Sequence, residues 1–245
     1  VADPRWAGFD VPPTGNANYA WIMHMISKLS EHGTAGFVLA NGSMSSNTSG
    51  EGSIRQKIIE QDLVDCMIAL PGQLFYTTQI PVCLWFISKN KQQDTQRGYR
   101  NRKGETLFID ARDMGSMVSR VHKELTTDDI THIANTYHAW RQSDEAIKAA
   151  LEAQQNEQLL QEHKNVEPEK DVAGYCKAAT RDDIKANDYV LTPGRYVGAA
   201  EIEDDGIPFE QKMSELSQTL FKQMEEGQEL DKAIRQNLKE LGYGG

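Results

Sequence analysis

The sequence predicts an α/β fold with a mostly helical C-terminal region. Two short apolar runs, residues 64–70 and 82–87, are rich in β-branched and aromatic residues, which is typical of buried strands. Segments with apolar residues at helical spacing precede and separate the predicted strands. A long tail, residues 209–241, repeats apolar residues every three or four positions. These observations favour a sheet covered by helices, followed by a long helix.

The first half of the chain predicts alternating helices and strands. Residues 16–30 have a broad apolar helical face, and a loop rich in Gly, Ser and Asn precedes a second helix, for which Ser53 is the expected N-cap. The close spacing of the last two strands suits an antiparallel pair. The predicted order is helix 16–30, strand 35–40, loop 41–52, helix 54–62, strand 64–70, loop 71–81 and strand 82–87.

The second half is more helical. Thr126 and Asp129 have the spacing of a capping box, which predicts a helix start. Gly227 interrupts the tail helix and marks either a bend or a split into two helices. The predicted order is a mobile basic connector 89–103, strand 106–112, helix 127–140, polar helix 143–163, strand 174–180, helical turn 181–187, loop 191–198 and helix 209–241.

Composition limits the class of protein. Apolar residues make up 39% of the chain, and the longest apolar run is far too short to cross a bilayer. The first residues lack the apolar core of a signal peptide, and three cysteines without metal-ligand spacing are expected as buried thiols, so we expect a cytoplasmic protein. The six histidines show no metal spacing either. A net charge of −10 disfavours non-specific DNA binding by the chain alone and indicates that specific binding needs a partner.

The loop 71–81 carries more large apolar side chains than most loops, among them Leu74, Phe75, Tyr76 and Ile80. Two readings are open. The rings could form a stacking surface for an extruded nucleobase. Alternatively, Phe75 and Tyr76 could fill a local core beneath the loop.

Four motifs occur in the chain in a fixed order: LANGSMSS at 39–46, ALPGQLFYTTQIPVCLWF at 69–86, LFIDAR at 107–112 and LTPGRYVG at 191–198. Together they resemble the modification (M) subunit of type I restriction–modification systems, a DNA adenine-N6 methyltransferase. The resemblance extends over essentially the whole chain. Two motifs of that family, the glycine motif that binds S-adenosyl-L-methionine and the catalytic N-P-P-F, are absent here and would precede Val1. Because the chain begins with Val1 rather than Met, we expect it to be the C-terminal part of a longer protein.

The resemblance implies the C-terminal half of a class I (Rossmann-like) methyltransferase sheet, whose last strand inserts antiparallel between its two predecessors. The first strands would be missing, which would leave the strand 35–40 with an unpaired edge. Residues 1–120 would then be a partial catalytic domain, and residues 121–245 a helical region for subunit docking. S-adenosyl-L-methionine would be the cofactor of the full-length enzyme, with none expected on this fragment.

The resemblance also suggests roles for individual residues. Phe75 aligns with the aromatic residue that packs against the flipped adenine, with Tyr76 as its neighbour, and Asn41 and Gly42 lie in the loop at the active-site rim. The basic connector offers candidate phosphate contacts, although a solvated loop is the alternative: Lys89, Lys91, Arg97, Arg100, Arg102 and Lys103. The apolar stripe of the tail is expected to dock on the DNA-specificity (S) subunit, unless it belongs to a core of its own: Met213, Leu216, Leu220, Met224, Leu230, Ile234 and Leu238.

The chain is therefore expected to form part of an adenine-specific DNA methyltransferase that acts with the S subunit, a restriction (R) subunit and double-stranded DNA, and to be inactive alone. The alternative is a non-catalytic assembly module, from proteolysis or a split gene, that only binds partner subunits.

Overall fold

The computed structural model of the chain describes residues 3–142, 171–199 and 209–243. They fall into two compact units, Val1–Glu201 and Ile202–Gly245, and each is described by itself. The predicted helix at 143–163 lies outside the described residues. The functional division predicted at residue 120 stays a prediction, although strands from both sides of that position share one sheet.

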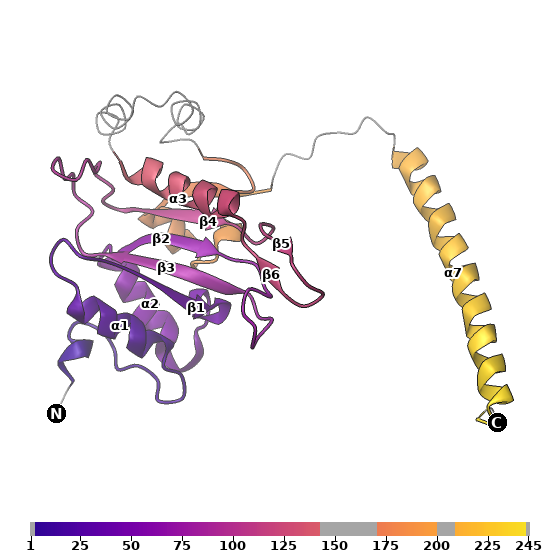
Figure 1. Cartoon of the computed structure of the whole chain (residues 1–245). Helices are drawn as coiled ribbons and strands as arrows, with labels where there is room; N and C mark the ends of the chain where they lie inside the picture. Colours follow the sequence, from indigo (N-terminus) through magenta and orange to yellow (C-terminus); the bar gives the residue numbers. More distant parts are fainter. Residues whose placement is uncertain (1–2, 143–170, 200–208, 244–245) are drawn as a thin grey trace. The chain divides into compact units, whose positions relative to one another are not determined.

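The first unit is built on a five-stranded mixed sheet in the order β1-β3-β2-β4-β7 (Figure 1). Strand β3 lies between β1 and β2 and is antiparallel to both, whereas β2 and β4 are parallel. The predicted insertion of the last strand between its two predecessors is thus confirmed. The strands are β1 (Thr34–Ala40), β2 (Val64–Ala69), β3 (Val82–Ser88), β4 (Glu105–Asp110) and β7 (Cys176–Thr180).

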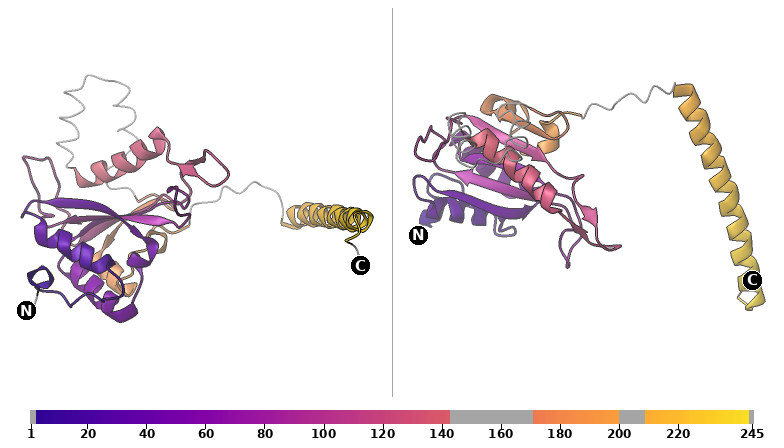
Figure 2. Two further views of the ribbon diagram at one scale, coloured as in Figure 1. Left: turned by 60° about the horizontal axis from the view of Figure 1, so that its bottom comes forward. Right: turned by 45° about the horizontal axis from the view of Figure 1, so that its top comes forward.

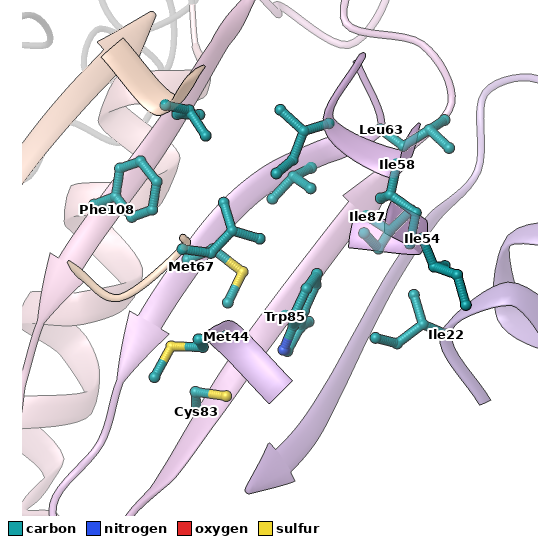
Figure 3. Packing of buried hydrophobic residues seen from close by; sticks show 14 of the residues in the cluster. Ile22, Met44, Ile54, Ile58, Leu63, Met67, Cys83, Trp85, Ile87 and Phe108 are labelled. Carbon is teal, nitrogen blue, oxygen red and sulfur yellow. The ribbon is translucent and has the colours of Figure 1, made fainter. Parts of the chain in front are cut away.

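Helices cover both faces of the sheet (Figure 2, left). On one face, α1 (Asn18–Lys28) and α2 (Glu51–Glu60) pack on a core that contains Trp85, and Met67 lies between Trp85 and Phe108 in this core (Figure 3). Trp85 is fully buried, because β3 is a central strand with covered faces. Each large side chain buried in this way contributes about 1.5–3 kcal/mol to stability.

The other face is covered by α3 (Thr127–Arg141), which contributes Ile133, Tyr137 and Trp140 to a second core. Its N-terminus has the predicted capping box. The Thr126 side chain accepts from the Asp129 amide, and the Asp129 carboxylate accepts from the Thr126 amide. A second box, formed by Thr180 and Asp183, starts the short α6 (Arg181–Ala186). Short 3-10 turns complete the unit: η1 (Pro4–Trp6), η2 (Asn41–Met44), η3 (Thr48–Gly50) and η4 (Pro193–Arg195).

Three local predictions were wrong. Helix α2 begins at Glu51 with Gly50 as its N-cap, and the Ser53 hydroxyl instead donates to Asp10 Oδ2 at 2.5 Å. The segment 89–103 is not a loose connector, because Lys91 and Arg102 are buried and anchor it to the sheet. A small hairpin, β5 (Ser116–Met117) paired with β6 (Lys123–Glu124), was not predicted at all.

Strand β1 forms an open edge of the sheet. Within the described residues it pairs with β3 alone, and its exposure alternates along its whole length. Val38, on the face away from α1 and α2, is 46% exposed. The predicted unpaired edge at this strand is therefore present.

The second unit contains α7 (Phe209–Glu240), a single helix that continues through Gly227 without the split considered above. At about 1.5 Å per residue, its 32 residues span about 48 Å. Among the described residues, none of the helices combines the length and apolar character that a membrane span requires.

Candidate functional site

The carboxyl ends of β1, β2 and β4 lie at one edge of the sheet, because these three strands run in the same direction. The chain leaves this edge in three segments: the turn η2, the loop 71–81, and the residues that follow Asp110. Gly194 of η4 joins them, since a Cβ there would lie 2.8 Å from the Arg112 guanidinium. In α/β sheets this edge is where ligands are usually bound.

The loop 71–81 folds back on itself and holds Phe75 and Tyr76 outward. The Gln73 amide donates to the Gln79 carbonyl at 3.2 Å. Leu74 packs on the second core, whereas Phe75 is 42% and Tyr76 89% exposed. This exposure contradicts the alternative that both rings fill a core beneath the loop.

Gly72 is required for the close return of this loop. A Cβ at Gly72 would lie 2.7 Å from the Gln79 carbonyl oxygen, closer than real Cβ contacts allow. The next residue, Gln73, has a left-handed φ of 64°, which costs a non-glycine residue some strain. The backbone of the loop is therefore held in a specific shape rather than left as an extended excursion.

The hairpin β5–β6 braces the loop. The ring of His122 stacks on Tyr76 with centroids 4.4 Å apart and planes 20° from parallel. The Lys123 amide donates to the Gln73 carbonyl at 2.9 Å. Loop and hairpin project together beyond the sheet edge (Figure 2, right). Sequence reasoning missed this element and treated His122 as an ordinary histidine. The only local signal was the apolar pair Met117–Val118 before Ser119 and Arg120, with Val121 after them.

Asn41 and Gly42 lie at the same edge, in η2 directly after β1. The next residue, Ser43, is fixed inside the core: Tyr19 donates to its carbonyl at 2.6 Å, and Trp85 Nε1 donates to its hydroxyl at 3.0 Å. Burial raises the pKa of Tyr19 to about 12, so its hydroxyl remains a donor at neutral pH. The Asn41 Oδ1 is buried and has no hydrogen-bond partner among the described residues, so this acceptor remains available to a further group.

The basic segment 89–103 is at the opposite edge. It leaves the carboxyl end of β3, which runs against β2, and so lies about 20 Å from the loop 71–81 at the usual rise per residue. Its exposed members Lys89 and Arg97 donate to the Leu29 and His32 carbonyls at 2.6 and 2.9 Å. Figure 1 shows the two edges on opposite sides of the sheet.

Three of the six candidate phosphate contacts form close ion pairs with acidic residues of this chain. Lys91 Nζ donates to Asp62 Oδ1 at 2.7 Å, and burial lowers its pKa. Arg102 pairs with Asp65 at 3.2 Å, and both side chains are almost fully buried. Arg100 pairs with Glu105 at 2.8 Å and donates to the Trp140 carbonyl. A buried cation cannot approach a phosphate, so the prediction for Lys91 and Arg102 was wrong. Lys103 is exposed.

The cysteines and acidic residues make no metal site in the described part of the chain. Cys66, Cys83 and Cys176 are buried free thiols, as predicted. Burial raises the pKa of each, which keeps them protonated and poorly reactive. No group of three His, Cys, Asp or Glu among the described residues has metal-binding geometry.

The residues at the sheet edge do not fit a complete S-adenosyl-L-methionine site. The turn after β1 is closed by Ser43 and Met44, both buried. The chain also lacks the glycine motif and N-P-P-F of the family. The edge offers a hydrogen-bond acceptor, Asn41 Oδ1, and a projecting aromatic surface formed by Phe75 and Tyr76.

A mixed sheet in which the antiparallel β3 lies between β1 and β2, covered by helices on both faces, is the arrangement of the C-terminal half of a class I methyltransferase sheet. The family model for N-6 DNA methylases matches residues 1–205, and the chain belongs to this family. The resemblance to type I M subunits seen in the four motifs is confirmed by the relatives below.

Two curated relatives match nearly the whole chain. It is 50% identical over 241 residues to the Type I restriction enzyme HindI methylase subunit of Haemophilus influenzae, covering 98% of this chain and 47% of that protein. It is 41% identical over 233 residues to the MjaIX methylase subunit of Methanocaldococcus jannaschii, covering 95% of this chain and 36% of that protein. The chain therefore spans half or less of the length of these relatives.

A solved structure agrees. The type I restriction-modification system methyltransferase subunit from Streptococcus thermophilus superposes with a TM-score of 0.60 at 25% identity, covering 80% of this chain and 34% of that one. A chain from a type I R-M system complex shares the fold, with a TM-score of 0.51 at 12% identity over 98% of this chain and 43% of that one.

Proposed function

We propose that this chain is the C-terminal part of an adenine-N6 DNA methyltransferase subunit of a type I restriction–modification complex, and that its loop 71–81 holds the target adenine after extrusion. The observation that carries this proposal is the exposure of Phe75 and Tyr76 at the carboxyl edge of a methyltransferase sheet. An extruded base loses its stacking in the duplex, and an aromatic face replaces it.

Phe75 is the better candidate for the base contact. Tyr76 already stacks one face of its ring on His122, whereas Phe75 has no aromatic partner among the described residues. Leu74, directly before it, anchors the loop to the core, so the Phe75 backbone is held while its ring is available. A stack on such a ring contributes about 1–3 kcal/mol.

The rest of the active site would come from residues outside this chain. The open edge of β1 is suited to pairing with a further strand, which would bring the methyl donor's cradle and the N-P-P-F motif next to Asn41. The unpartnered Asn41 Oδ1 would then face that added half. S-adenosyl-L-methionine, when bound there, supplies the methyl group; this chain supplies the rim and the aromatic clamp.

The partners follow from the same proposal. DNA is the substrate, the S subunit recognises its sequence and docks on the apolar stripe of α7, and the R subunit joins for cleavage. Seven apolar side chains of this stripe are 43–65% exposed, which a helix tolerates when a partner covers them. Three free, buried cysteines suit a reducing cytoplasm.

The base contact is tested by Phe75→Ala in the complete subunit, assembled with its S partner. We expect weaker methylation and a loss of the fluorescence rise from 2-aminopurine placed at the target position, by the equivalent of about 1–3 kcal/mol. Tyr76→Ala is the matched variant and should lower both values less. If Phe75→Ala leaves methylation and fluorescence unchanged, Phe75 is not in the pocket.

The exposed stripe of α7 also favours a second candidate, an assembly module that only binds partner subunits. The two functions differ in what lies upstream. A reading frame that continues upstream with a glycine motif and N-P-P-F supports the enzyme. Calorimetry of this chain with S-adenosyl-L-methionine adds a second measurement, because micromolar binding by the chain alone contradicts the proposal that the cradle lies elsewhere.

A further inference from the structure

The hairpin β5–β6 and the segment around it form a rigid projection beside Phe75 and Tyr76. The backbone closes tightly at its tip, since the amides of Val118 and Ser119 both donate to the His122 carbonyl at 3.0 and 3.2 Å. Gly115 at its base is restricted to glycine: its φ is +83°, and a Cβ would lie 2.8 Å from the Glu124 carbonyl. Such a hairpin keeps its shape when it meets a partner.

The tip presents apolar side chains to solvent. Met117, Val118 and Val121 are 48%, 53% and 54% exposed. Arg120, between the two valines, is also exposed. Nearby charges are mixed: Arg112 is paired with Asp110 at 2.6 Å, and Glu124 lies 3.5 Å from His122. Proteins that kink DNA insert apolar side chains between base steps and use Arg or Lys for other contacts to the duplex, and this tip offers both kinds of side chain.

The hairpin and the loop 71–81 act as one body. The stack of His122 on Tyr76 and the bond from the Lys123 amide to the Gln73 carbonyl join them at two points. A base held at Phe75 therefore brings the duplex from which it came toward the hairpin. The continuity of the two surfaces argues for DNA as the occupant of the tip.

We propose that the β5–β6 hairpin is a second DNA-contacting element, which rests on the proposed base clamp. Val118 and Val121 fill the gap that the extruded adenine leaves in the duplex, Arg120 contacts a backbone phosphate, and His122 is a positioning residue that holds Tyr76 and the loop. An apolar wedge of this kind stabilises the extruded state because it replaces the stacking that the departing base gives up.

The wedge is tested in the complete subunit with its S partner, using duplexes with 2-aminopurine at the target. We expect Val118→Ser with Val121→Ser to lower the fluorescence rise about tenfold on a paired target, and much less when a mismatch has already weakened the target pair. The matched control, Val118→Ile with Val121→Ile, keeps the apolar tip and should keep the signal. Equal losses on paired and mismatched targets would overturn the wedge.

Two further variants separate the parts of the proposal. Arg120→Gln should lower the salt slope of DNA binding by about 0.9, while Arg120→Lys should leave it unchanged. His122→Ala should reduce base extrusion, and His122→Phe, which restores the stack on Tyr76, should recover it. If His122→Phe fails to recover extrusion while its thermal unfolding matches the parent protein, His122 does not position the loop.

Phe75→Ala, measured in parallel, distinguishes failure of this inference from failure of the base clamp. If Phe75→Ala leaves base extrusion unchanged, the proposed base clamp is wrong. If Phe75→Ala reduces extrusion but the Val118→Ser, Val121→Ser variant does not, only the proposed wedge is wrong. Loss of S-subunit capture by the hairpin double variant would also overturn the proposal, since the tip would then contact protein.

Discussion

The hydroxyl of Tyr137 donates a 2.6 Å hydrogen bond to Oδ2 of Asp65 and so ties α3 to the middle of the sheet. The other oxygen of Asp65 accepts from Arg102 Nε at 3.2 Å. Burial, and the nearby carboxylate, raise the pKa of Tyr137, which keeps its hydroxyl a donor. The basic segment after β3 therefore delivers Arg102 to a buried acid, and its role is structural.

Removing Arg102 should destabilise the fold strongly. Arg102→Met leaves the Asp65 carboxylate buried without its cation, and losing one partner of a buried pair costs about 3–5 kcal/mol. Lys103→Met, the exposed neighbour, should change stability by less than about 0.5 kcal/mol. Urea unfolding of the chain measures both. Equal, small effects would mean that the Asp65 site is wetter than its burial indicates.

Neutralising the exposed basic residues at the opposite edge should not affect the DNA contact near the target base. Lys89→Gln, Arg97→Gln and Lys103→Gln together should leave the salt slope of DNA binding by the assembled complex unchanged. The reason is their position about 20 Å from the loop 71–81, across the length of the sheet. A slope that falls by about 0.9 for each residue removed would restore the phosphate role suggested by the sequence.

Acid should weaken the two capping boxes together. Hydrogen bonds from Thr126 and Thr180 hold the pKa of Asp129 and of Asp183 below the ordinary value of 3.8. Their contribution is fully present above that value and is lost as the pH falls through the lower folded-state pKa. In the Asp129→Asn, Asp183→Asn variant, the free energy of unfolding should therefore fall less steeply as the pH drops below about 4. Thermal unfolding between pH 2 and 6 measures this, and parallel curves for parent and variant would contradict it.

Local patterns predicted the parts of the fold that depend on local chemistry. The apolar run at 64–70 favoured a buried strand, and Thr126 with Asp129 predicted a helix start. The capping position of α2 was missed because Ser53 has a favourable side chain, whereas Gly50 is used for its left-handed backbone, with φ of 88°. Residue type alone does not distinguish these two ways of starting a helix.

The site was predictable only where the family resemblance reached it. The motif around Phe75 indicated an aromatic contact, but whether the ring is buried or exposed depends on where Leu74 packs. The phosphate contacts predicted for the basic segment were wrong at Lys91 and Arg102. The sequence does not show that the fold pairs these two residues with Asp62 and Asp65. The β5–β6 hairpin has only a weak local signal, and its placement against the loop depends on the bond from Lys123 to Gln73, which is distant in sequence.

The exposed apolar stripe of α7 should be required for capture by the S subunit. Leu220 and Ile234 are 56% and 55% exposed on this helix, and placing a carboxylate at either position would leave a charge in the middle of an apolar contact. We expect Leu220→Asp with Ile234→Asp to reduce pull-down by the S subunit at least tenfold, as deletion of residues 209–241 should. Gln218→Asp lies on the opposite side of the helix from Leu216 and Leu220 and adds a charge outside the apolar stripe, so this variant should bind the S subunit normally. Retained capture after the double change would show that the stripe is not the docking surface, and equal loss for Gln218→Asp would show that added negative charge, rather than a broken apolar contact, is the cause.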